Sequence, residues 1–196
     1  MKKVDSLQAA KLLREGEIII AALDAMLALL CDARIEESVS KMRKLKNRSA
    51  EKGFSVLMDS DTRINLYLGE IPSLAWDILD TSDAPLILVL PPSKASGHKG
   101  RKLAPSVYAQ DGTVAMRMAA DRYEEQLVQM ANAPLACTAL LTEDGSPAGH
   151  PEQGAAAVLD EVGYVLSLQP AKTKYPAPVI PVIKLGMSGE VEIIRG

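Results

Sequence analysis

Hydrophobic residues recur along the chain at two spacings, which predict two kinds of element. Apolar positions three or four residues apart, with charged residues between them, predict helices. Between residues 36 and 46, for example, Val39, Met42 and Leu45 form one apolar face. The first helix is capped at Asp5 or Ser6 and stops at Gly16. Further helices are expected at 36–46, 61–68, 74–79, 123–130 and 155–162.

Short uninterrupted apolar runs, such as residues 18–22 and 86–90, are typical of strands buried on both faces. Further strands are expected at 54–58, 113–118, 135–141, 164–168, 179–185 and 190–194, with loops at 93–102 and 143–153. Strands alternate with helices, which predicts an α/β fold with an open, mixed sheet flanked by helices. No internal repeat or break in composition divides the chain, so residues 1–196 are expected to form a single domain.

The composition is that of a globular protein. Hydrophobic residues make up 47% of the 196 and charged residues 24%, which excludes wholesale disorder. The longest apolar run, residues 18–23, is far shorter than the ~20 residues of a membrane span, and no secretory signal pattern is present. Cys31 and Cys137 are too few for a disulfide framework or a zinc site. We therefore expect a cytoplasmic protein without a metal site.

Positive charge is concentrated in one stretch. Six basic residues lie within 41–52, although the net charge of the chain is −3. Cations such as Lys46 and Arg48 at the end of a helix are favoured by its macrodipole, but Arg forks and Lys charges also hold phosphate or carboxylate. A second basic cluster, at 94–102, reads alone as a solvated loop. Together the two clusters could form a basic surface for RNA or a nucleotide.

Residues with catalytic potential are sparse. His98 and His150 fall in loops without an obvious carboxylate partner, so both are interpreted as surface residues. The two cysteines lie in apolar runs and are interpreted as buried hydrophobes. Asp24 interrupts the apolar run 18–30; we interpret it as a loop or capping residue, with a buried functional carboxylate as the alternative.

The order of several segments is more informative than any one motif. The segments are Leu-Leu-Arg-Glu-Gly-Glu-Ile-Ile-Ile (12–20), Cys-Asp-Ala (31–33), Leu-Lys-Asn-Arg-Ser-Ala-Glu-Lys (45–52), Ala-Pro-Leu-Ile-Leu-Val-Leu-Pro (84–91), Gly-Thr-Val-Ala-Met-Arg-Met (112–118), Ala-Pro-Leu-Ala-Cys-Thr-Ala-Leu-Leu (133–141), Asp-Gly-Ser-Pro (144–147) and Val-Glu-Ile-Ile-Arg-Gly (191–196). In this order they resemble the YrdC/YciO-type domain family, which includes threonylcarbamoyl-AMP synthase. The resemblance covers nearly the whole chain, and its most distinctive motif is Lys-x-Arg followed by Lys.

The resemblance implies a twisted α/β sheet with a concave basic pocket. Members of the family bind ATP and are similar to double-stranded RNA binders, and the synthases make threonylcarbamoyl-AMP from threonine, bicarbonate and ATP for tRNA modification. The family's Lys-x-Arg and following Lys, which hold anionic groups of the substrates, fall on Lys46, Arg48 and Lys52. The arginine of its Val-Arg-Val-Pro strand falls on Arg117.

Several polar positions of the family are replaced in this chain. Asp24 alone remains of the Tyr-Pro-Thr-Glu/Asp-Thr strand end, and Thr138 alone remains of the Ser-Thr-Ser-Ala-Asn nucleotide motif. The family's Tyr-Gly-Leu-Gly has become Leu-Ala-Leu-Leu (27–30), and its later Ser-Thr pair has become Ile180-Pro181. Each lost hydrogen bond to a buried ligand costs ~1–3 kcal/mol, and four or five would total ~5–10 kcal/mol, enough to abolish a micromolar site. The pocket is therefore expected to be more apolar, or filled.

Three functions follow from these residues. The first is a pseudoenzyme that binds RNA, including tRNA, or a phosphate-bearing small molecule through Lys46, Arg48, Lys52, Arg117 and Thr138, with Asp24 as a pocket carboxylate. The second is an active ATP-dependent synthase with an altered substrate; ATP with magnesium is expected as a cofactor under this alternative alone. The third is a non-catalytic scaffold of a tRNA-modification complex.

Overall fold

A computed structural model describes residues 1–23, 26–82, 84–92, 101–167 and 180–195 of the chain. The helices are α1 (Ser6–Arg14), α2 (Glu36–Leu45), α3 (Asp61–Tyr67), α4 (Ser73–Thr81), α5 (Arg122–Ala131) and α6 (Ala156–Glu161), with short 3₁₀ turns η2 (Pro105–Val107) and η3 (Pro151–Gln153). The strands are β1 (Lys2–Val4), β2 (Ile19–Leu23), β3 (Met26–Asp32), β4 (Ser55–Met58), β5 (Ile87–Leu90), β6 (Val114–Met118), β7 (Leu135–Ala139), β8 (Tyr164–Leu166), β9 (Val182–Leu185) and β10 (Val191–Arg195).

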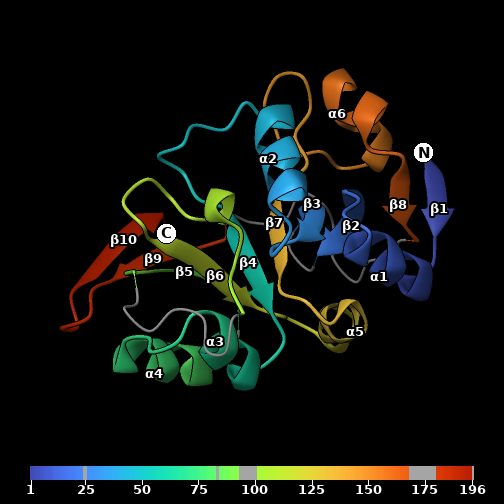
Figure 1. Ribbon diagram of the computed structural model, residues 1–196. Helices are drawn as coiled ribbons and strands as arrows, with labels where there is room; N and C mark the ends of the chain where they lie inside the picture. The colour runs from blue at the N-terminus through green and yellow to red at the C-terminus, as the bar shows by residue number, and fades with distance from the viewer. Residues whose placement is uncertain (24–25, 83, 93–100, 168–179, 196) are drawn as a thin grey trace.

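These strands form one mixed, open sheet in the order β1-β8-β2-β3-β7-β4-β6-β5-β9-β10. The pairs β1–β8, β2–β8, β4–β6 and β5–β9 are parallel, and the other pairs are antiparallel. Strand β1 therefore lies at one end of the sheet and β10 at the other, so the two ends of the chain lie far apart (Figure 1). The predicted α/β class, with an open mixed sheet between helices, is confirmed.

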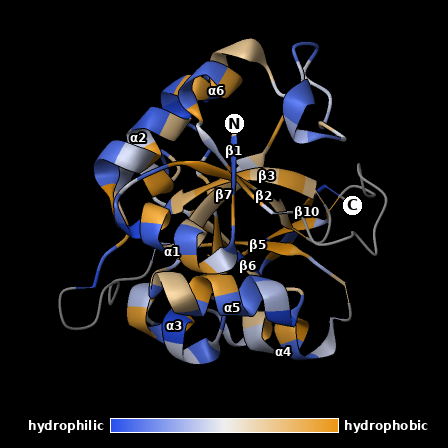
Figure 2. Ribbon diagram, turned by 90° about the vertical axis from the view of Figure 1, so that its right-hand side faces the viewer, coloured by the Kyte–Doolittle hydropathy of each residue, from blue (hydrophilic) through white to orange (hydrophobic). Residues whose placement is uncertain are grey.

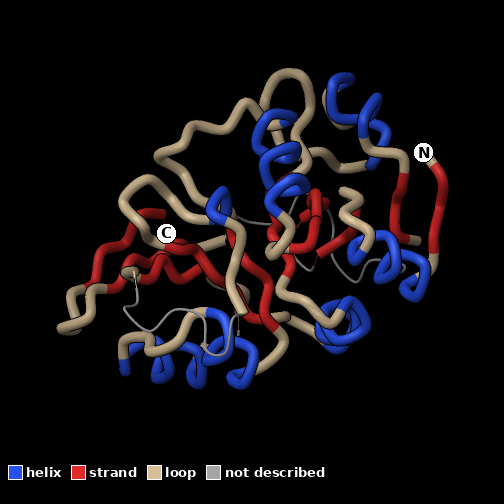
Figure 3. Tube along the Cα trace, in the orientation of Figure 1, coloured by secondary structure: helices blue, strands red, loops and turns tan. Residues whose placement is uncertain are grey.

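Two apolar cores lie against the twisted sheet. One contains buried residues of α2, α3, α4 and α6, and the other contains buried residues of α1 and α5. The helices lie on either side of the strands (Figure 3), and apolar residues gather on the strands while the helices carry mixed faces (Figure 2). Within the described ranges, no helix combines the length and the apolar character needed to cross a membrane.

The predicted helices and strands are present, with described ends that shift by at most three residues; residues 168 and 179, the predicted ends of two strands, lie outside the described residues. The side chain of Asp5 accepts a hydrogen bond from the Gln8 backbone N–H and the Gln8 side chain accepts one from Asp5, so Asp5 rather than Ser6 caps α1. Gly16 follows the helix with a φ of +89°, a left-handed conformation that glycine adopts without steric cost.

The sequence pattern missed β1 and β3. Strand β3 pairs antiparallel with β2, and Leu23 lies opposite Met26 at the end of the pair. Both strands are almost wholly buried, so the whole segment reads as one apolar run without the alternation that marks a half-exposed strand. Asp24 and Ala25, between the two strands, lie outside the described residues, as do residues 93–100 of the predicted basic loop.

Candidate functional site

A cavity of about 770 Å³ lies on the face of the sheet that also packs against α5. Its floor consists of small side chains on four neighbouring strands: Ala28 of β3, Ala139 and Cys137 of β7, Ser55 of β4, and Ala115 of β6. The strand register places these residues side by side, since Ala28 is opposite Ala139 and Ser55 is opposite both Cys137 and Ala115. Because side chains this short leave space above the sheet, the pocket is open and not filled.

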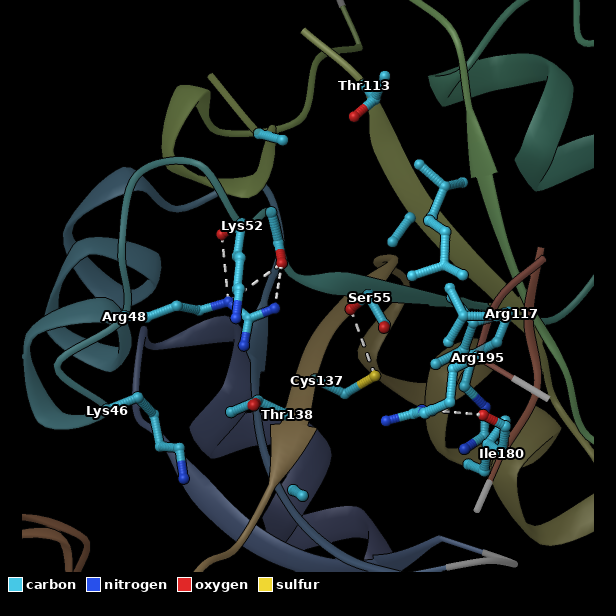
Figure 4. A pocket seen from close by; sticks show the side chains of 18 of the residues that line it. Lys46, Arg48, Lys52, Ser55, Thr113, Arg117, Cys137, Thr138, Ile180 and Arg195 are labelled. Carbon is cyan, nitrogen blue, oxygen red and sulfur yellow. Dashed lines mark hydrogen bonds between the residues drawn. The ribbon is translucent and has the colours of Figure 1, made fainter. Parts of the chain in front are cut away.

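The connection between α2 and β4 forms a basic edge along this cavity. Lys46, Arg48 and Lys52 all lie in this connection and all line the cavity (Figure 4). Lys46 is the residue at the C-terminus of α2, so the macrodipole interpretation also applies to it. In the described part of the chain, no carboxylate forms an ion pair with any of the three. The basic edge therefore retains its positive charge.

Arg48 also helps to build the edge on which it lies. Its Nε donates to the carbonyl oxygens of Lys52 and Gly53, at 3.2 and 3.1 Å. Its guanidinium carbon lies 5.0 Å from the centre of the Phe54 ring, a cation–π distance. Burial, and then the charge of Arg43, lower the pKa of Arg48. Replacement of Arg48 should therefore disturb the loop as well as any bound anion.

Arg43 makes a second set of bonds to the same loop. It donates to the carbonyl oxygens of Ser49, Lys52 and Ser106, at 2.7, 3.1 and 2.6 Å. Its guanidinium carbon lies 5.2 Å from the centre of the Phe54 ring. The loop is thus fixed to α2 and to η2, which contains Ser106. The sequence alone does not distinguish Arg43 from the rest of the basic stretch.

Lys46 is partly buried at the edge of the cavity. Burial, followed by the nearby charge of Arg48, lowers its pKa to about 8. Near neutral pH the group is still mostly an ammonium, but it loses its proton under mildly alkaline conditions. An anion bound beside it would restore the charged form.

Arg117 lies at the other side of the cavity, and its charge is compensated. Only 2% of the residue is exposed, and its Nη2 donates to both carboxylate oxygens of Glu124 on α5, at 3.1 and 2.8 Å. Its Nε is buried and has no hydrogen-bond partner among the described residues. The predicted anion-binding arginine is therefore part of a buried ion pair, and its Nε N–H has no acceptor among the described residues.

Hydroxyl and thiol groups also line the described part of the cavity. Thr138 lines it at the end of β7, beside the floor residues. The Cys137 thiol donates to the Ser55 carbonyl oxygen at 3.3 Å, and burial raises its pKa to about 11, so it remains a thiol at neutral pH. Asp24, the predicted pocket carboxylate, lies outside the described residues, although its neighbours Leu23 and Met26 line the cavity.

The C-terminal hairpin, formed by the antiparallel strands β9 and β10, contributes cavity residues that the sequence did not indicate. Arg195 of β10 lines the cavity and donates from Nε to the Ile180 carbonyl oxygen at 2.9 Å. The Nζ of Lys184, on β9, lies 3.4 Å from a carboxylate oxygen of Asp111, another lining residue. Thr113 also lines the cavity and donates to Asp111. The parallel pairing of β9 with β5 brings the hairpin here, and no local pattern indicates that pairing.

Other predicted groups lie elsewhere or are not described. His150 is an exposed residue that caps η3, consistent with a surface role. Arg101 and Lys102, the described end of the second basic cluster, are exposed and do not line the cavity, while His98 is outside the described residues. No group of three or more His, Cys, Asp or Glu side chains comes together as a metal site in the described part of the chain.

Several threonylcarbamoyl-AMP synthases are similar to this chain in sequence. Threonylcarbamoyl-AMP synthase of Coxiella burnetii (strain RSA 493 / Nine Mile phase I) is 26% identical over 140 residues, which is 71% of each chain. The synthase of Pseudoalteromonas atlantica is 29% identical over 140 residues, 69% of this chain and 68% of the relative.

Solved structures share the fold. P. abyssi Sua5 complexed with L-threonine superposes with a TM-score of 0.74 at 19% identity, covering 100% of this chain and 57% of that one. This chain therefore spans little more than half the length of that protein. E. coli YciO superposes with a TM-score of 0.73 at 16% identity, covering 98% and 92%. At these identities the superpositions establish the fold alone.

A family model covers almost the whole chain. The Sua5/YciO/YrdC model, described as "Telomere recombination", matches residues 11–196. This span includes the basic edge, the cavity floor and the C-terminal hairpin described above. The chain belongs to the Sua5/YciO/YrdC family.

Proposed function

We propose that this protein binds a phosphate-bearing small molecule, a nucleotide such as ATP, in the cavity and has no threonylcarbamoyl-AMP synthase activity. The observation that carries the proposal is the basic edge: Lys46 and Lys52 reach the cavity with no carboxylate paired to them among the described residues, and Arg48 lies between them. A volume of about 770 Å³ is within the range of small-molecule sites. Lysine ammoniums and an arginine fork are suited to phosphate oxygens.

The rest of the described lining disfavours synthase activity. Much of it is apolar, and the side chains of Ala28, Ala139, Ile180 and Val182 offer a polar substrate no hydrogen bond. A buried polar group of a substrate left without a partner costs ~1–3 kcal/mol. Several such losses would weaken the binding of a polar amino acid more than the binding of a nucleotide's phosphates.

Calorimetric titration with ATP tests the binding half of the proposal. We expect ATP to bind the wild-type protein, and Lys52→Met to weaken binding roughly tenfold or more, since charged hydrogen bonds contribute ~1.5–3 kcal/mol. Lys44→Met is the matched control, because Lys44 is an exposed lysine of α2, the helix that precedes this connection, and does not line the cavity. Equal affinities in the two variants would place the phosphate elsewhere.

Pyrophosphate release tests whether the protein has synthase activity. The protein is incubated with ATP, threonine and bicarbonate beside an active synthase as the positive control. We expect release at the background rate. Turnover above background would show that the cavity makes the threonylcarbamoyl adenylate in spite of its apolar lining, and would overturn this part of the proposal.

RNA, including tRNA, is the second candidate ligand. The observation in its favour is the exposed pair Arg101 and Lys102, together with exposed Lys44 and Lys52. The basic edge faces a cavity rather than an extended surface, which favours the small molecule. Binding of tRNA that falls steeply with salt would indicate phosphate contacts along a strand.

A further inference from the structure

The cavity has an apolar wall whose buried residues belong to neither of the two main cores. Ile87 and Ile180 are 8% and 4% exposed and form a small cluster with Met26, Ala115 and Val182. All five residues line the cavity. Four of them come from β3, β5, β6 and β9, and Ile180 lies two residues before β9, so the wall exists only once distant segments have paired. None of the five side chains carries a hydroxyl, amide or charge.

The wall and the basic edge lie on opposite sides of the cavity. In Figure 4, Lys46, Arg48 and Lys52 lie on one side, and Ile180 lies on the other beside Arg195 and Arg117. Ser55 and Cys137, from the floor, lie between the two sides. The cavity therefore offers a phosphate group and an apolar group different surroundings at the same time.

Two arginines lie beside the apolar wall. Arg195 uses Nε to hold the Ile180 carbonyl oxygen at 2.9 Å, and its two terminal nitrogens have no hydrogen-bond partner within the described ranges. The buried Nε of Arg117 likewise has none there. Guanidinium N–H groups bind a carboxylate in a fork. The neighbourhood of the wall thus combines an aliphatic surface with hydrogen-bond donors for a carboxylate.

Among the described residues that line the cavity, those with a hydroxyl group lie on other elements than Ile87, Ile180 and Val182, although Ser55 is opposite Ala115. Ser49 belongs to the basic loop, Ser55 and Thr138 lie on β4 and β7, and the Thr113 hydroxyl already donates to Asp111. A hydroxyl group of a ligand placed against the side chains of Ile87, Ile180 and Val182 would lose its water and gain no hydrogen bond from these three side chains. A methyl group of the same size would gain contact at no such cost.

We propose that the apolar wall binds the branched aliphatic group of a small carboxylate, whose carboxylate is held by Arg195, and that the cavity selects this compound over its hydroxyl-bearing isostere. The proposal rests on the proposed function, since it names the second compound that shares the cavity with the nucleotide. The cavity thus prefers valine to threonine. The two amino acids differ only in that threonine has a hydroxyl group where valine has a methyl group.

Two isosteric pairs test the preference by calorimetry on the protein saturated with ATP: L-valine against L-threonine, and 3-methylbutanoate against 3-hydroxybutanoate. We expect the aliphatic member of at least one pair to bind about 10- to 100-fold more tightly, the discrimination that an apolar pocket achieves against an added hydroxyl. Equal binding within both pairs, tighter binding of the hydroxyl compounds, or no binding of any of the four overturns the inference.

A pair of variants locates the effect. Val182→Thr places a hydroxyl in the wall without changing its size, and we expect it to reduce the preference severalfold. Val191→Thr makes the same change on the neighbouring strand β10, where the side chain is exposed and does not line the cavity, and should leave the preference unchanged. Equal effects of the two variants overturn the assignment to the wall.

The same titrations separate this inference from the proposed function. ATP is titrated first, without any carboxylate. Binding of ATP without an aliphatic preference overturns the inference and leaves the proposed function standing. An aliphatic preference in a protein that does not bind ATP supports the wall and overturns the nucleotide site.

Discussion

Lys46 lies at the C-terminus of α2 and reaches the cavity, where burial and the nearby Arg48 lower its pKa to about 8. An unfolded chain would hold this lysine near its ordinary pKa of 10.5. Between these two values the unfolded state binds more protons than the folded state, so this residue makes the free energy of unfolding increase with pH across that window. Below pH 8 the charged group opposes folding, which is the expected cost of a cation kept for an anionic ligand.

The binding of ATP should therefore depend on pH through Lys46. Above pH 8 the free protein must take up a proton to bind, so we expect the affinity to fall about tenfold between pH 7 and pH 9. Lys46→Met should bind more weakly at pH 7 and show little further loss up to pH 9. Calorimetric titration across this range measures both. A wild-type affinity that stays constant from pH 7 to 9 would remove Lys46 from the phosphate site.

At the scale of elements, the connection from α2 to β4 is fixed in place by side chains. The three carbonyl bonds of Arg43 and the two Nε bonds of Arg48 meet on the backbone of residues 49–53 and on Ser106. Part of the local positive charge thus has a structural use. The basic stretch is neither a solvated face nor a set of six equivalent ligands.

Arg43→Ala should show this structural use directly. We expect the free energy of unfolding to fall by about 1–3 kcal/mol, since several carbonyl oxygens lose a charged donor. Urea denaturation measures the loss. Lys41→Ala is the control on the same helix: Lys41 forms an exposed ion pair with Glu161 at 2.9 Å, and such pairs contribute less than about 1 kcal/mol. If both variants lost the same stability, the bonds of Arg43 would not fix the loop.

The elements themselves could largely be predicted from the sequence where their pattern is local. The face of Val39 and Met42 in α2 and the cap at Asp5 are such cases, because each depends on residues within one or two turns. Strand β3 could not be separated from β2, because burial on both faces removes the alternation that distinguishes a strand. Strand β1 is too short and too polar to carry a signal, and its pairing with β8 places it in the sheet.

At the scale of the whole molecule, a chain of net charge −3 places positive side chains around one cavity. A compact anion meets these cations together, whereas a long polyanion would also meet the acidic remainder of the surface. Long-range repulsion of this kind is screened by salt, but contacts inside a cavity are screened less.

We therefore expect tRNA to bind weakly at 200 mM salt, while ATP keeps most of its affinity. Fluorescence polarisation at 50 and 200 mM salt measures both ligands. An RNA-binding protein with 6–10 phosphate contacts loses about 10³–10⁵ in affinity over this range. Tight tRNA binding at 50 mM with a loss of that size would favour RNA as the ligand.

The candidate site could be predicted only in part. Lys46, Arg48 and Lys52 lie within seven residues of one another, so local charge and the resemblance were enough to select them. Arg195, Lys184 and the apolar wall around Ile180 depend on the pairing of β9 with β5, about 95 residues earlier in the chain. The neutralisation of Arg117 by Glu124 depends on how α5 packs on the sheet, which no spacing in the sequence reveals.

The floor of the cavity has a consequence for how such a protein can diverge. Floor strands β3, β4 and β6 turn one set of residues toward the cavity and the alternate set into a core: Ala28 faces the ligand space, while Leu27 and Leu29 belong to the core on the other face of the sheet. Substitutions at the first set can change what is bound, while the second set preserves the fold. In the course of evolution, substitutions at alternate positions of these strands can therefore change the bound ligand while the fold is preserved.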